Sequence, residues 1–126
     1  MKCIMEFDKK DYLPVLKLYI FGAPHCRQLD VIHKAFRETL IREAKKIKLK
    51  IPIDYPIDLY VVFIDPTTPD LDNLIDALYR ALDAKASLKT VKYKGESILT
   101  DDGLIQKVIM SKFYPNGPLK NENRIP

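Results

Sequence analysis

Aspartates in two stretches of the chain are the residues best suited to chemistry. Asp70 and Asp72 stand with Asn73 at the head of a helical-looking segment, and Asp101 and Asp102 precede an apolar run further along. Hard cations such as Mg²⁺ prefer carboxylate oxygens, and one or two aspartates suffice when a substrate phosphate completes the shell. A fold that joins the two stretches would therefore hold Mg²⁺ or Mn²⁺ and could hydrolyse a phosphodiester.

Both stretches also have an explanation that needs no ligand. Aspartate commonly caps helix N-termini, so Asp72 is a natural N-cap, and Asp101 with Asp102 and Gly103 fits a turn. Residues two apart on a helix point in different directions, so Asp70 and Asp72 share an ion only if Asp70 lies in the entering loop. The pattern is compatible both with a metal site and with ordinary caps and turns.

The apolar pattern predicts the elements that position these acids. Strands are expected over residues 15–21, 57–64 and 104–114, and the second is apolar on both faces, as in a central strand covered on both sides. Apolar residues at steps of three and four predict helices over 29–47 and from 72 to about 86. The order β-α-β-α-β indicates a small α/β domain of mixed α+β type, in which two helices flank a central sheet.

The 126 residues fit one compact domain, with residues 1–13 and 115–126 expected to be peripheral. Hydrophobic residues make up 47% of the chain and charged residues 30%, which argues against global disorder. Neither a signal peptide nor an apolar run of ~18 residues occurs, so we expect a cytoplasmic protein with no membrane contact. Cys3 and Cys26 lack the spacing of zinc ligands and are expected to be reduced thiols.

The basic residues suit a polyanionic partner without demonstrating one. The net charge is +4 and the pI is near 9.0. A solvated surface is the commoner explanation of such charges, and nucleic-acid contact is the alternative. The residues expected to contact DNA are Arg27, Lys34, Arg37, Arg80, Lys85, Lys89, Lys92, Lys94 and Lys107.

A second apolar line runs along the second helix. Leu71, Ile75 and Tyr79 recur at four-residue spacing beside the main apolar stripe. Such a line predicts either a more deeply buried helix or a homodimer contact, and a domain of this size has limited core in which to bury two stripes.

The Asp-Leu-Asp-Asn-Leu string at 70–74, followed by a helix and by Asp101-Asp102 before a strand, resembles the RusA family of Holliday-junction resolvases. The resemblance implies a small homodimer that binds four-way DNA junctions and makes paired, Mg²⁺-dependent cuts in recombination and repair. Asp70, Asp72 and Asp102 match the essential carboxylates of that family, with Asp101 as an auxiliary ligand. The resemblance is good over residues 57–113 and fair over 15–47.

One position departs from the family pattern in its charge. Asp76 stands where the family typically has a catalytic lysine, so it could add a metal ligand but not a cation. Arg80, or a lysine from residues 85–94, would have to supply that charge. This departure favours an alternative, a relative that binds branched DNA without cutting it. A third alternative is a dimeric interaction module that uses Ile75 and Tyr79 and binds no nucleic acid.

Overall fold

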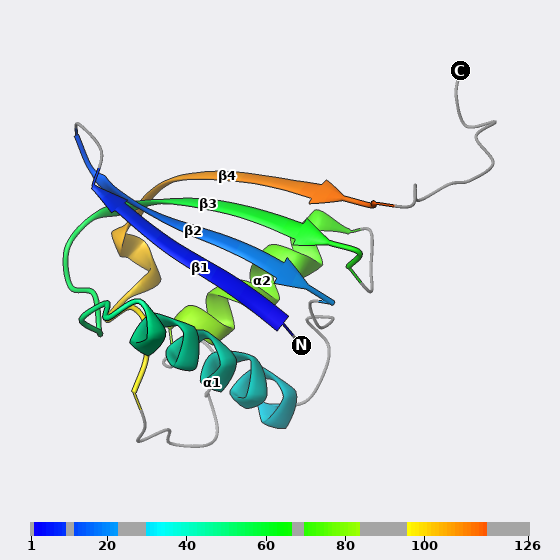
Figure 1. Ribbon diagram of the computed structural model, residues 1–126, viewed down its shortest axis with the longest axis horizontal. Coiled ribbons are helices and arrows are strands. Elements are labelled where there is room, and N and C mark those ends of the chain that lie inside the picture. Colours follow the sequence, from blue (N-terminus) through cyan, green and yellow to red (C-terminus); the bar gives the residue numbers. More distant parts are fainter. Residues whose placement is uncertain (1, 10–11, 23–29, 67–69, 84–95, 116–126) are drawn as a thin grey trace, which may run out of the picture.

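The computed structural model describes residues 2–9, 12–22, 30–66, 70–83 and 96–115. They form one four-stranded sheet and two helices (Figure 1). The strands, which are neighbours in sequence order, are β1 (Lys2–Lys9), β2 (Pro14–Phe21), β3 (Ile57–Ile64) and β4 (Ile105–Phe113). The helices are α1 (Asp30–Lys46) and α2 (Leu71–Leu82), and a short 3-10 helix, η1 (Asp102–Leu104), precedes β4. The expected mixed α/β class is confirmed.

The order of elements differs from the expectation at the N-terminus. Residues 2–9 form an edge strand, β1, that the sequence pattern did not predict, so the order is β-β-α-β-α-β. The three predicted strands and the first helix agree with the structure to within one residue at each end. The second helix is shorter than expected, because Asp83 closes α2 as its C-cap and donates its backbone N–H to the Tyr79 carbonyl.

Strand direction determines which residues meet at each edge of the sheet. β1 is antiparallel to β2, whereas β2, β3 and β4 are mutually parallel. The parallel strands follow one another in a single direction across the sheet, so crossovers of the usual hand place α1 and α2 on the same face. Figure 1 shows both helices on that side.

The core lies between the sheet and the two helices. Alternate residues of β2 and β3 point toward the helices and are fully buried, as are the apolar faces of α1 and α2. A strand that is covered on one face buries every second residue, because successive side chains point to opposite faces of the sheet. The buried strand and helix residues include Leu16, Leu18, Ile20, Leu59, Phe63, Phe36, Leu40, Leu74 and Leu78.

The opposite face of the sheet carries no helix of the described chain. Tyr19 and Tyr60 meet there edge to face, with ring centroids 6.5 Å apart. On the same face Ile4, Ile109 and Phe113 are 43%, 49% and 55% exposed. Within the described residues the central strand β3 is therefore covered on one side only, contrary to the expectation from its apolar sequence.

Candidate metal centre

Asp70 begins α2 as its N-cap, a role that the sequence pattern assigned to Asp72. One carboxylate oxygen of Asp70 accepts from the Asp72 backbone N–H at 3.0 Å, and the other accepts from Asn73 Nδ2 at 3.1 Å. The cap satisfies a backbone donor that the first turn leaves without an intrahelical partner. Both oxygens of Asp70 are thus engaged in starting the helix.

A different set of carboxylates gathers at the other end of α2. Asp83, Asp101 and Asp102 each offer an oxygen that lies within 4.8 Å of the other two. Asp83 is only 5% exposed, and its Oδ2 accepts from the Asp102 backbone N–H at 3.1 Å. Asp101 caps η1 and accepts from the Gly103 N–H at 2.9 Å. These contacts fix the side chains of Asp83 and Asp101 beside Asp102, and the cluster could hold a metal ion.

Burial and the negative charge of the cluster raise the pKa of two groups, Asp102 and Tyr79. Partial burial raises the pKa of Asp102, and the neighbouring carboxylates of Asp83 and Asp101 raise it further. Burial also raises the pKa of Tyr79, with a smaller contribution from the charge of Asp102. Three carboxylates this close favour either a shared proton or a bound cation, because both relieve the same repulsion.

The expected site of Asp70, Asp72 and Asp102 does not form. β3 and β4 are parallel, so the residues that follow β3 and those that precede β4 lie at opposite edges of the sheet. Eight residues of strand span ~26 Å, and α2, which runs back between the two edges, is ~18 Å long for its 12 residues. Asp102 is accordingly joined by Asp83 rather than by Asp70 and Asp72.

The sequence pattern missed Asp83, although a signal for it is present. The residue directly follows the buried Ala81 and Leu82, at the point where the apolar stripe of α2 stops. The end of a helix and the start of the next parallel strand meet at one edge of the sheet. A polar residue at the helix end therefore becomes a neighbour of the acids before β4.

Asp76 and Arg80 form a pair on the middle of α2. Arg80 Nε lies 3.1 Å from Asp76 Oδ2, at the i to i+4 spacing that brings helix side chains together. Asp76 does not belong to the acidic cluster, which contains Asp83, Asp101 and Asp102. Asp76 is therefore not among the carboxylates that could hold a metal ion in this cluster.

The expectation that Arg37 contacts DNA is wrong, because its side chain is inside the protein. Arg37 is 1% exposed, and its Nη2 donates to the Arg80 carbonyl at 2.7 Å. Arg80 lies in the last turn of α2, where carbonyls lack intrahelical partners. The guanidinium joins α1 to α2 and meets the negative end of the α2 dipole.

The other basic residues divide into a surface set and a set that is not described. Lys34 on α1 and Lys107 on β4 are exposed and can meet a polyanion, while Arg80 is half-buried beside Asp76. The remaining residues expected to contact DNA lie outside the described residues: Arg27, Lys85, Lys89, Lys92 and Lys94.

The second apolar line of α2 packs against the protein's own core. Leu71, Ile75 and Tyr79 are partly buried and contact the central cluster of apolar residues. This packing is the deeper burial that the sequence pattern left open, and it accounts for the line without a second subunit.

Compared with known proteins, the chain matches no family model, no curated protein and no solved structure. In the described part of the chain, neither helix has the length and hydropathy needed to cross a bilayer.

Proposed function

We propose that the protein binds a divalent cation, Mg²⁺ or Mn²⁺, through Asp83, Asp101 and Asp102, and that it cuts phosphodiester bonds of branched DNA there. The proximity of the three carboxylates carries the proposal, since their oxygens lie within 4.8 Å of one another. The donor set fits the metal, because hard cations of this kind prefer carboxylate oxygen and retain several waters. A bound cation would activate a water and neutralise charge on the phosphate.

The chain's own residues would hold and orient these ligands. Asp83 is buried at the end of α2 and is fixed by the Asp102 N–H, so it would act as the rigid ligand. Asp101 is exposed and held by the Gly103 N–H, so it would face the substrate side. A pre-formed set of ligands avoids the cost of ordering side chains when the ion binds.

Branched DNA is proposed as the substrate on three grounds. The RusA-like string supplies the reaction class, although the proposed centre retains only Asp102 of its three matched carboxylates. The chain has a net charge of +4. Lys34 is exposed on α1 and would contact phosphates.

A second candidate function is binding of branched DNA without cleavage. Its support is the use of Asp70 as a helix cap and the pairing of Asp76 with Arg80. In this case the RusA-like string would start a helix rather than hold a catalytic metal. Binding would then weaken steeply with salt, while the junction stayed intact.

We further propose that a homodimer forms through the open face of the sheet rather than through α2. Four strands about 4.8 Å apart and eight residues long give a face of roughly 20 by 26 Å, or ~520 Å², which is at the low end of interface sizes compared with the ~800 Å² per partner of a standard interface. The positive and negative side chains of this face balance, and Lys17 already pairs with Asp8 at 2.8 Å. A second copy of the same face therefore suits it better than a polyanion does. The charged residues of the face are Lys2, Lys17, Lys107, Glu6, Asp8 and Asp58.

Sedimentation velocity tests the dimer with a matched pair of charge insertions. Ile109→Lys places a charge on the open face, and Ile47→Lys places one beyond α1 at a residue of similar exposure, 40% against 49%. We expect the first to yield monomers and the second to leave the dimer intact. A monomeric parent protein, or a dimer that survives Ile109→Lys, would overturn this interface.

Two aspartates provide a matched test of the metal centre. Asp101 and Asp70 are both exposed caps that accept a backbone N–H two residues further on, at 2.9 and 3.0 Å. Asparagine keeps the capping oxygen in each case, so Asp101→Asn and Asp70→Asn make the same chemical change. We expect Asp101→Asn to weaken Mn²⁺ binding at least tenfold, or ~1.4 kcal/mol, and Asp70→Asn to leave it unchanged.

Mn²⁺ binding is measured by the loss of the free-ion electron paramagnetic resonance signal. Equal effects of the two substitutions on Mn²⁺ binding, or no effect of Asp101→Asn, would refute the proposed metal centre. Activity is measured by nicking of a labelled mobile four-way junction with Mg²⁺ and with EDTA. Mg²⁺-dependent nicking that Asp101→Asn abolishes supports the nuclease, whereas salt-dependent binding of an intact junction supports the second candidate.

A further inference from the structure

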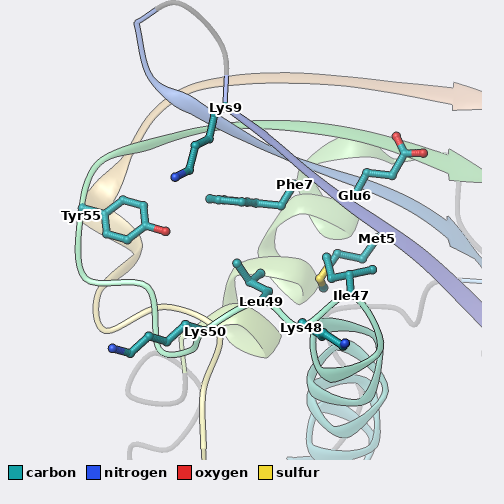
Figure 2. Close-up of a pocket in the computed structure, with 9 residues that line it drawn as sticks. All are labelled: Met5, Glu6, Phe7, Lys9, Ile47, Lys48, Leu49, Lys50 and Tyr55. Atoms are coloured by element: carbon teal, nitrogen blue, oxygen red, sulfur yellow. The ribbon is translucent and has the colours of Figure 1, made fainter.

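A pocket of about 400 Å³ lies between β1, the turn after α1 and the segment that leads into β3 (Figure 2). This volume is within the range of small-molecule sites. Apolar and aromatic side chains alternate in its wall with three lysines and one glutamate. The lining residues are Met5, Glu6, Phe7, Lys9, Ile47, Lys48, Leu49, Lys50 and Tyr55.

The wall of the pocket exposes large apolar groups next to cations. Ile47 and Tyr55 are 40% and 39% exposed, although neither is needed to cover the core. In Figure 2 the Lys9 ammonium lies between the rings of Phe7 and Tyr55. Aromatic rings beside ammonium groups suit a ligand that has a flat ring and a separate negatively charged group.

Lys48 occupies a backbone position that normally belongs to glycine. Its φ is 57°, in the left-handed region. The Lys48 N–H donates to the Lys45 carbonyl at 3.1 Å and the Leu49 N–H to the Ala44 carbonyl at 2.9 Å, the pattern of a Schellman cap. A side chain with a Cβ is disfavoured there, and in Figure 2 the Lys48 ammonium points away from the rings of Phe7 and Tyr55.

One pair of bridged segments leads to the pocket wall on one side and to the acidic cluster on the other. Ile53 and Leu99 form a parallel bridge, in which the Ile53 N–H donates to the Ile98 carbonyl at 2.7 Å. Two residues further along each segment are Tyr55, in the pocket wall, and Asp101, in the cluster. A ligand in the pocket therefore lies at the same edge of the sheet as the proposed metal centre.

We propose that this pocket binds one nucleotide unit, with the base against Phe7 and Tyr55 and the phosphate held by Lys9. The inference deepens the proposed function and rests on it for the biological substrate, a nucleotide beside the bond to be cut. Stacking on aromatic rings together with phosphate contacts from lysines is how unpaired nucleotides are held without base-specific hydrogen bonds. The pocket is large enough for one such unit.

Titration of the full chain with deoxyadenosine monophosphate, in EDTA and low salt, tests the proposal independently of any metal. We expect saturable binding that is at least tenfold tighter than that of deoxyadenosine or of inorganic phosphate. Equal binding of deoxyadenosine would show that Lys9 is not used, and equal binding of phosphate that the rings are not used. Either result, or no saturation, overturns the proposal even if Mn²⁺ still binds at Asp101.

Two substitutions separate binding from folding. Lys9→Gln removes the ammonium beside the rings, so we expect several-fold weaker nucleotide binding. Lys48→Gly removes an ammonium that points away from the rings, so it should leave binding unchanged with an equal or higher Tm. Tyr55→Ala should weaken binding about tenfold, whereas Tyr12→Ala, at a tyrosine that is 90% exposed and does not line the pocket, should not. Unchanged affinity in Lys9→Gln or Tyr55→Ala would overturn the assignment.

Discussion

Replacement of Arg37 by methionine should destabilise the protein without a direct effect on DNA contact. The guanidinium is 1% exposed and donates at 2.7 Å to the Arg80 carbonyl in the last turn of α2. A hydrogen bond from a charged donor contributes ~1.5–3 kcal/mol, and a buried carbonyl left without its donor costs ~1–3 kcal/mol. Methionine keeps much of the aliphatic volume, so we expect a loss of ~2–3 kcal/mol, or a fall in Tm on the order of 10 °C for a domain of this size.

The assay is thermal unfolding followed by circular dichroism, with Lys34→Met as the matched control. Lys34 is one turn earlier on α1 and exposed, so its replacement should change stability by less than ~0.5 kcal/mol. Among variants still folded at the assay temperature, we expect Lys34→Met, and not Arg37→Met, to reduce the salt dependence of junction binding. An unchanged Tm in Arg37→Met would refute the stabilisation that we attribute to this hydrogen bond, and would mean that methionine replaces the buried charge at no net cost.

Three further outcomes follow from the contacts and from the raised pKa values of two groups. Burial raises the pKa of the Cys3 thiol from 9.0 to about 12, so we expect iodoacetamide at pH 8 to label Cys3 only as fast as the protein unfolds. We also expect the free energy of unfolding to fall between pH 9 and 12, because the thiol ionises in the unfolded state first. The raised pKa of Asp102 means that the folded state binds its proton more tightly, so stability without metal should fall as pH rises from about 3.8 through that pKa, and Asp102→Asn should flatten the curve. Asp76→Lys exchanges an ion pair with Arg80 for repulsion, which should cost less than ~1 kcal/mol in thermal melts and should not increase junction nicking, because Asp76 lies outside the acidic cluster.

Local patterns were sufficient to predict most elements of the fold. The apolar runs of β2, β3 and β4 and the stripe of α1 predict their own boundaries, because burial on one face imposes a period of two or of 3.6 residues. β1 has the same period of two, with Cys3 and Met5 buried, but its outward residues are exposed and mostly charged. An edge strand with so few apolar residues resembles a polar N-terminal segment until β2 is available to pair with it.

The buried position of Arg37 could not be read from the pattern either. On the helical period it belongs with the basic residues next to the apolar stripe, and most arginines in such places are solvated. Its burial depends on the end of α2 lying against α1, which brings the Arg80 carbonyl within reach. That contact joins residues 43 apart in the chain and has no local signal.

The position of the acidic cluster follows from strand direction, and this explains why the Asp70 motif is misleading. In a run of parallel strands, every residue that follows a strand lies at one edge of the sheet, and every residue that precedes a strand lies at the other. Asp70 belongs to the first kind, and Asp101 and Asp102 to the second. A helix that returns from the first edge to the second ends beside the next strand's start, which places Asp83 with Asp101 and Asp102. Once β3 and β4 are taken as parallel, a metal site built from the ends of α2 and η1 is the arrangement that topology permits, and one built on Asp70 and Asp102 is not.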